Sequence, residues 1–120
     1  MKAYKLTESE EKFAEIIWKN ETIGSGELVK ICEKEMNWKK STTYTVLKKL
    51  CDKKIFKNEN AVVSSLIKKD EYCSKQSIRF VEDTFEGSLP KFITSFISGK
   101  KLSEKQAEEL KKLIDDHKEA

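Results

Sequence analysis

The sequence has few of the residues from which catalytic and metal sites are commonly built. It contains one histidine, His117, in an acidic segment, and it has no phosphate-binding glycine loop, nucleophile-elbow motif or cluster of metal ligands. Its three cysteines, Cys32, Cys51 and Cys73, are widely spaced and form no C-x-x-C pair, which argues against a disulfide framework or a zinc site. The sequence therefore predicts neither an enzyme nor a protein that needs a metal or another cofactor.

Long apolar runs are also absent. None approaches the roughly 20 residues that a membrane-spanning helix needs. The first residues lead into charged sequence without the apolar core of a signal peptide. We therefore expect no membrane insertion and a cytoplasmic location.

The charge is distributed unevenly, although the net charge is only +3. Between residues 38 and 57, Asp52 is the one acid among seven lysines, whereas acids outnumber lysines between residues 103 and 120. A basic middle and an acidic end predict a local site for a polyanion.

The basic segment, residues 39–54, has the pattern of a helix with two unlike faces. An apolar stripe has the helical spacing i, i+3, i+4, i+7 and i+8. The opposite face is polar and basic, as in a helix that enters the major groove of DNA, although a solvated lysine-rich face remains the alternative. The stripe consists of Thr43, Val46, Leu47, Leu50 and Cys51, and the other face of Ser41, Tyr44, Thr45, Lys48, Lys49 and Asp52.

The flanking segments complete a recognisable order of elements. Thr7 and Glu10 form a capping box for a helix to about Asn20, and Ser25 is the expected N-cap of a second helix. After the basic helix, residues 55–57 and 61–67 have strand character and are joined by residues 58–60, which predicts a β-hairpin. Three helices followed by a hairpin are the order of a winged helix-turn-helix.

From residue 69 the helical pattern returns in three short amphipathic segments. The first, near residues 70–85, is expected to bury Tyr72, Ile78, Val81 and Phe85. So small a segment cannot bury its apolar stripes alone, so we predict dimerisation, with folding back onto the winged helix of the same chain as the alternative. The fold class is thus mainly α, with a winged-helix DNA-binding domain at 1–68 and a helical dimerisation domain at 69–120. The predicted dimer residues are Phe85, Leu89, Phe92, Ile93, Phe96, Ile97, Leu110, Leu113 and Ile114.

Several of these segments together resemble the penicillinase repressor family, the BlaI/MecI type. The resemblance rests on residues 6–10, on Ile16-Ile17-Trp18, on the Thr-x-Tyr-Thr-x-Leu-x-x-Leu pattern of residues 42–50 and on the three C-terminal helices. It implies a homodimeric transcriptional repressor that binds dyad operators near β-lactamase and related resistance genes. It also implies a membrane-bound sensor protease as a partner, which cleaves the repressor just before a phenylalanine. By position, the cleaved bond is Ser95-Phe96, although the family commonly has asparagine in place of Ser95.

DNA contacts are predicted on the basic helix and on the hairpin, which forms the wing. Lysines are expected on phosphates, and Thr42, Tyr44, Thr45 and Lys48 on base edges. Two other functions stay open: a winged-helix module that binds an acidic protein, and a redox-responsive repressor that uses Cys73. The DNA-binding candidates are Lys39, Lys40, Ser41, Thr42, Tyr44, Thr45, Lys48, Lys49, Lys57, Asn58 and Asn60.

Overall fold

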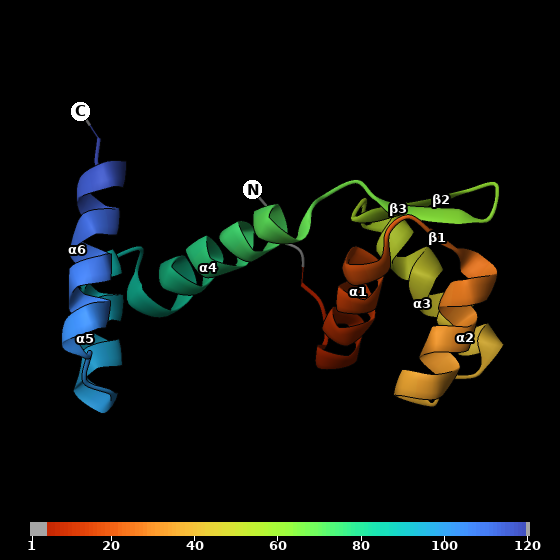
Figure 1. Ribbon diagram of the computed structural model, residues 1–120, viewed down its shortest axis with the longest axis horizontal. Coiled ribbons are helices and arrows are strands. Elements are labelled where there is room, and N and C mark those ends of the chain that lie inside the picture. Colours follow the sequence, from red (N-terminus) through yellow and green to blue (C-terminus); the bar gives the residue numbers. More distant parts are fainter. Residues whose placement is uncertain (1–4, 120) are drawn as a thin grey trace. The chain divides into compact units, whose positions relative to one another are not determined.

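The computed structural model describes residues 5–119, which form six helices and a three-stranded antiparallel sheet (Figure 1). The predicted fold class, a mainly helical protein with a winged helix followed by a helical segment, is confirmed. The chain divides into two compact units, one that extends to Arg79 and one that begins at Phe80. The predicted domain boundary between residues 68 and 69 falls just before helix α4 and stays a prediction.

The first unit contains the winged helix. Its elements are α1 (Glu8–Asn20), β1 (Ile23–Gly24), α2 (Ser25–Met36), α3 (Lys40–Asp52), β2 (Phe56–Glu59), β3 (Val62–Ser65) and most of α4 (Lys69–Phe85). The strands lie in the order β1-β3-β2. The second unit holds the end of α4 together with α5 (Leu89–Gly99) and α6 (Glu104–His117).

Local capping signals fix the starts of three helices. The predicted box of α1 is confirmed, since Thr7 Oγ1 accepts a hydrogen bond from the Glu10 amide at 3.1 Å and Glu10 Oε1 accepts one from the Thr7 amide at 2.9 Å. Ser103 and Gln106 form a second such box at the start of α6. In α5, Ser88 is the N-cap and Pro90 lies in the first turn, where a proline removes no helical hydrogen bond.

The start of α2 differs from the prediction. Gly24, not Ser25, is the N-cap, and Ser25 is the first helical residue. The reason is a long-range contact: Ile23 and Gly24 pair with β3, and the Ser25 amide donates a hydrogen bond to the Ala61 carbonyl at 2.8 Å. Residues 23–26 are therefore a short strand that runs directly into a helix.

The hairpin is confirmed, but its turn begins two residues later than predicted, at Asn60 instead of Asn58. Asn58 and Glu59 belong to β2, where they pair with Val63 and Val62. The chain reverses instead at Asn60 and Ala61, with φ values of 51° and 62°. Two consecutive positive φ values define the type I′ geometry that matches the twist of a hairpin.

Ala61 is poorly suited to that geometry, because a Cβ atom in the left-handed region crowds the following carbonyl. We therefore expect Ala61→Gly to raise the free energy of unfolding by about 0.5–1 kcal/mol, the relief of strain exceeding the extra entropy of glycine in the unfolded chain. Urea denaturation measures the change. Ala14→Gly, in the interior of α1, is the control and should destabilise. Equal or lower stability of Ala61→Gly would contradict the assignment of strain.

The core of the first unit joins the three helices to the sheet. Its fully buried side chains come from α1, α2, α3 and the wing and include Phe13, Leu28, Leu50 and Phe56. Trp18 lies at its edge, with its ring centroid 5.4 Å from that of Phe56 and 5.3 Å from that of Tyr72. The indole Nε1 donates a hydrogen bond to the Ile67 carbonyl at 2.9 Å. Trp18 thus fixes the chain that leaves the wing against α1.

Of the four positions of α4 predicted to be buried, Tyr72 is buried and Val81 and Phe85 are partly buried, but Ile78 is exposed. The prediction for Ile78 is therefore wrong for the single chain. A helix buries a side chain only where another element packs on it. Tyr72, which contacts Trp18 and donates a hydrogen bond to Glu11 at 2.9 Å, lies in the first turn of α4, six residues before Ile78.

Candidate nucleic-acid interface

Helix α3 has one face in the core and one face in solvent, as predicted. Thr43, Leu47 and Leu50 are buried, and Val46 and Cys51 are partly buried. On the other side, Ser41, Thr42, Thr45 and Lys48 are exposed. The core therefore fixes the orientation of α3, and its hydroxyl and ammonium groups are available to a ligand.

The start of α3 is suited to an anion. Its N-cap, Lys39, makes no side-chain capping bond, and its first turn contains no acid, whereas the first turn of α1 contains three. The first amides of a helix lack helical partners and carry a partial positive charge. Lys39 and Lys40 are exposed at this end. These features together would hold a phosphate group of the DNA backbone.

Two of the three threonines of α3, Thr43 and Thr45, use their hydroxyl protons within the helix. Thr45 Oγ1 donates a hydrogen bond to the Ser41 carbonyl at 2.9 Å, and Thr43 Oγ1 donates one to the Lys39 carbonyl at 3.3 Å. Thr45 can therefore offer a ligand its methyl group and oxygen lone pairs, but not a free proton. That chemistry suits contact with a thymine methyl group.

Tyr44 lies differently from the other candidates. Its side chain is half-buried, and its hydroxyl donates a hydrogen bond to Ser25 Oγ at 3.2 Å, which joins α3 to α2. Tyr44 also lines a hollow of about 370 Å³ between α3 and β2, together with Leu47, Lys48, Cys51 and Asn58. Its predicted contact with a base stays a prediction.

The wing adds exposed polar groups to the interface. Lys57, Asn58 and Asn60 are all exposed, and Lys57 forms an ion pair with Glu59 at 3.2 Å. On α3, Lys48 forms a similar pair with Asp52 at 3.5 Å. Because both members of each pair are well exposed, these ion pairs are worth little and can be replaced by a phosphate.

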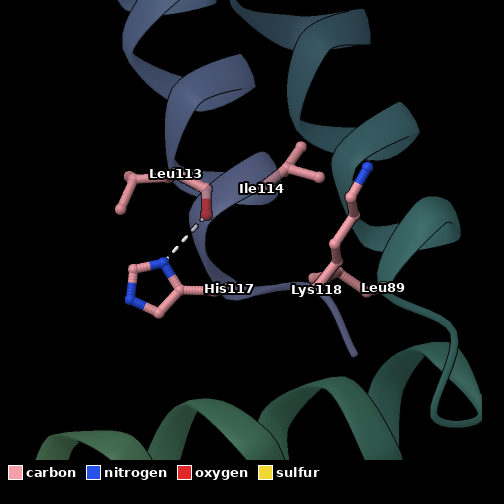
Figure 2. A pocket seen from close by; sticks show the side chains of 5 residues that line it. All are labelled: Leu89, Leu113, Ile114, His117 and Lys118. Atoms are coloured by element: carbon pink, nitrogen blue, oxygen red, sulfur yellow. Dashed lines mark hydrogen bonds between the residues drawn. The ribbon is translucent and has the colours of Figure 1, made fainter. Parts of the chain in front are cut away.

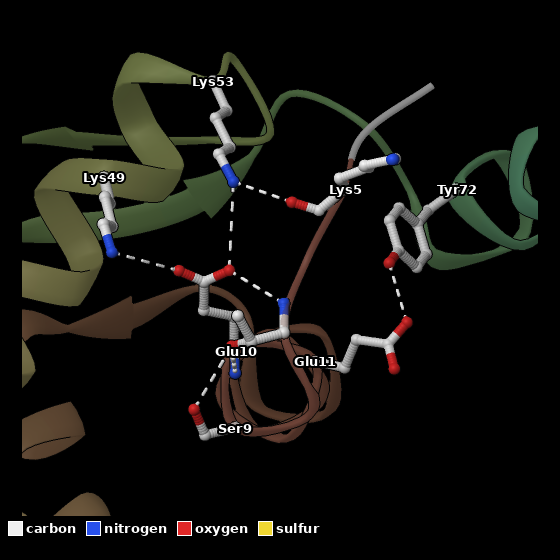
Figure 3. Close-up of polar contacts among 8 residues, drawn as sticks. Lys5, Ser9, Glu10, Glu11, Lys49, Lys53 and Tyr72 are labelled. Atoms are coloured by element: carbon white, nitrogen blue, oxygen red, sulfur yellow. Dashed lines mark hydrogen bonds and ion pairs between the residues drawn. The ribbon is translucent and has the colours of Figure 1, made fainter. Parts of the chain in front are cut away.

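Lys49 is held by a carboxylate that the sequence did not single out for this role. Glu10 lies on α1, and its side chain is only 7% exposed. Its Oε2 lies 3.5 Å from Lys49 Nζ, and its Oε1 lies 3.8 Å from Lys53 Nζ (Figure 3). Lys53 Nζ also donates a hydrogen bond to the Lys5 carbonyl at 2.8 Å. The same glutamate therefore caps α1 and joins α1 to α3.

The hydrogen bond from the Thr7 amide lowers the pKa of Glu10 below its ordinary value, helped by the charges of Lys53 and Lys49 and opposed by burial. A carboxylate with a lowered folded-state pKa stabilises the fold above its unfolded pKa, and this contribution is lost as the pH falls through the folded pKa. The difference in the free energy of unfolding between the wild type and Glu10→Gln should therefore be constant near neutral pH and shrink below about pH 4.

Urea denaturation across that pH range measures this difference. Glu8→Gln is the control, because it removes the same charge from the exposed side of the same helical turn. A difference for Glu10→Gln that stays constant down to pH 3 would contradict the role of the ionised carboxylate.

The cysteines occupy three different environments. Cys32 is buried in the core, and burial raises the pKa of its thiol to about 11. Cys51 is half-buried, and burial likewise raises its pKa. Cys73 is exposed on α4. Cys32 is therefore a core residue, whereas Cys51 lies at the edge of the core.

The predicted dimer residues lie on a largely exposed apolar face of the second unit. Phe85, Phe92, Ile93 and Leu110 are half-buried, whereas Leu89, Phe96, Ile97, Leu113 and Ile114 are exposed, and neither α5 nor α6 has a fully buried residue. Inside this unit the rings of Phe80, Phe85, Phe92 and Phe96 form a cluster with centroid distances of 5.5–6.4 Å.

An apolar hollow of about 420 Å³ opens on this face. Leu89 of α5 and Leu113, Ile114 and His117 of α6 line it, together with Lys118 (Figure 2). The imidazole is within hydrogen-bonding distance of the Leu113 carbonyl, at 2.9 Å from Nδ1. Leu113 and Ile114 are 54% and 61% exposed, so the hollow is open to solvent in the single chain.

Residues 5–119 contain neither a candidate metal site nor a candidate membrane-spanning helix. That part of the chain contains no group of three or more side chains able to hold a metal ion. None of its helices is both long and apolar enough to cross a membrane.

Comparison with known proteins agrees with this architecture. The profile of the penicillinase repressor family matches residues 6–116. A penicillinase repressor from Bacillus licheniformis is 24% identical over 117 residues, covering 94% of this chain and 91% of its own. A penicillinase repressor from Staphylococcus aureus is 28% identical over 105 residues, covering 84% of this chain and 83% of its own. The chain, with its winged helix and its second helical unit, therefore belongs to the penicillinase repressor family.

Proposed function

We propose that the protein is a homodimeric transcriptional repressor that binds a dyad operator through α3 and the wing, and that proteolysis in α5 releases it from DNA. The main support for DNA binding is the start of α3, where a helix end without a side-chain cap or acids is flanked by Lys39 and Lys40. The exposed polar face of α3 extends this basic surface toward the groove of a DNA duplex.

The apolar face of the second unit supports dimerisation. An exposed apolar face of this kind is stabilised when a second copy covers it. A symmetric dimer presents two winged helices to two half-sites of a palindrome. Joining the two modules raises the avidity for the operator by about 10²–10⁴ over that of one module.

Release by proteolysis follows from the same arrangement. Cleavage between Ser95 and Phe96 would separate Phe96, Ile97 and all of α6 from the rest of the dimer face. Both Ser95 and Phe96 are exposed in the single chain. The winged helix, whose core lies entirely before these residues, would remain folded but bind a half-site weakly. The protease would be a membrane-bound sensor, and the controlled genes would serve β-lactam resistance.

DNase footprinting upstream of the protein's own gene and its neighbours, at two salt concentrations, tests this function. We expect a protected dyad with two half-sites that weakens steeply as salt rises. Absence of protection at low salt, with protein shown to be folded and dimeric, would overturn operator binding and favour a module that binds an acidic protein.

The lysines at the start of α3 give a quantitative prediction. Lys40→Ala should reduce the slope of log K against log salt by about 0.9, the contribution of one phosphate contact, at every DNA sequence tested. Lys105→Ala removes the same charge from α6 and is the control. Fluorescence anisotropy with duplex DNA measures both slopes. An unchanged slope for Lys40→Ala would remove this residue from the interface.

A further inference from the structure

The buried carboxylate of Glu10 and the two lysines that face it have a consequence for DNA binding. We propose that Glu10 is an intramolecular competitor of the DNA phosphates for Lys49 and Lys53, and that it thereby lowers the affinity of the repressor for DNA. This inference rests on the proposed function, since it concerns the strength with which α3 binds DNA.

The carboxylate cannot move with the lysines. Glu10 Oε1 accepts the Thr7 amide at 2.9 Å, and the Glu10 side chain is 7% exposed. The capping box therefore holds it against α1 while it faces α3. A carboxylate in such a position favours neighbouring cations, because few water molecules can replace them.

The lysines, in contrast, can change partner. Lys49 is 63% exposed and Lys53 is 37% exposed, and each ammonium group lies at the end of a flexible stem. One carboxylate faces two ammonium groups, so a single positive charge is left over in the cluster (Figure 3). A phosphate that approaches the last turns of α3 must therefore compete with Glu10 for these cations.

Other lysines of the basic surface are not held in this way. Within residues 5–119, neither Lys39 nor Lys40 forms an ion pair. Lys48 and Lys57 have only exposed partners, Asp52 and Glu59. Glu10 is the carboxylate that is both buried and directed at α3, so it has the strongest hold on its lysines.

The test compares the wild type with Glu10→Gln in binding to a short duplex of mixed sequence, over a series of salt concentrations. Glutamine keeps the size of the side chain and removes its charge. We expect Glu10→Gln to bind this duplex about tenfold more tightly at low salt. We also expect its slope of log K against log salt to be steeper by one to two phosphate contacts, about 0.9 each. Glu8→Gln removes an exposed charge from the same turn and should leave the slope unchanged.

Lys49→Ala in the wild-type background gives a second test, which does not depend on the folding of Glu10→Gln. With Glu10 present, Lys49→Ala should reduce the slope less than Lys40→Ala does. In the Glu10→Gln background, Lys49→Ala should reduce the steepened slope of log K against log salt by one phosphate contact, about 0.9. Circular dichroism establishes that each variant is folded.

The outcomes separate the two proposals. If the wild type binds DNA and Glu10→Gln leaves the slope unchanged or lowers the affinity, the competition is overturned and operator binding stands. If Lys49→Ala and Lys40→Ala reduce the wild-type slope equally, the competition is again overturned. If no folded variant and no wild-type protein binds duplex DNA at low salt, both proposals fail.

Discussion

Replacing Phe96 by aspartate is expected to give a monomer whose affinity for the operator is lower by about 10²–10⁴. Phe96 packs on the ring of Phe92, with a centroid distance of 6.4 Å, and is still 48% exposed in the single chain. In the proposed dimer the second copy covers this exposed part. A carboxylate there would lose its water without gaining a partner, at a cost that a dimer interface cannot recover.

Analytical ultracentrifugation and operator titration measure the two effects together. Thr94→Asp is the matched control, because Thr94 is exposed and lies two residues away, on nearly the opposite side of α5. It should leave both the dimer and the affinity intact. A Phe96→Asp protein that remains dimeric at the same concentrations would move the dimer interface away from this face of α5.

Replacing Trp18 by alanine should reduce the free energy of unfolding of the first unit by about 3–5 kcal/mol. Trp18 contacts the rings of Phe56 and Tyr72 and donates a hydrogen bond to the Ile67 carbonyl. Alanine removes all three contacts and leaves a cavity where the wing and α4 meet α1. So large a loss is a substantial part of the stability of a small domain.

Trp18→Phe separates packing from hydrogen bonding. It keeps an aromatic ring and removes the indole N–H, so it should cost only about 1 kcal/mol. Urea denaturation followed by circular dichroism compares the variants. Equal losses for the two substitutions would show that the hydrogen bond to the Ile67 carbonyl, and not ring packing, carries the stability.

Helix starts that depend on local chemistry could be predicted from the sequence. The capping boxes at Thr7 and Ser103 need only residues three positions apart, and both are present. The face of α3 could also be predicted, because the spacing of Thr43, Leu47 and Leu50 determines which side is buried.

Features that depend on distant partners could not be predicted. Ser25 has the residue type of an N-cap, but the pairing of Gly24 with β3 shifts that role to Gly24. The turn of the wing lies at Asn60 and Ala61, although alanine is not a residue that favours positive φ. The hydrogen bond from the Tyr44 hydroxyl to Ser25 Oγ could not be predicted either, because it depends on the packing of α2 on α3.

The second role of Glu10 has the same origin. The capping motif identifies Glu10 as a local partner of Thr7, but nothing in residues 7–10 indicates Lys49 or Lys53. The contact exists because α1 and α3 contribute side chains to the same core, so it is visible only in the folded chain.

The placement of the aromatic residues separates the two units spectroscopically. Both tryptophans belong to the first unit, where Trp18 packs on Tyr72 and the ring centroid of Trp38 lies 5.4 Å from that of Phe13. In the second unit, phenylalanine is the only one of the three aromatic residue types in the sequence. Indole emission therefore monitors the winged helix alone, whereas far-ultraviolet circular dichroism monitors helices of both units. A dichroism transition that moves with protein concentration, while the emission transition stays fixed, would be the optical signature of a dimer that dissociates before its DNA-binding units unfold.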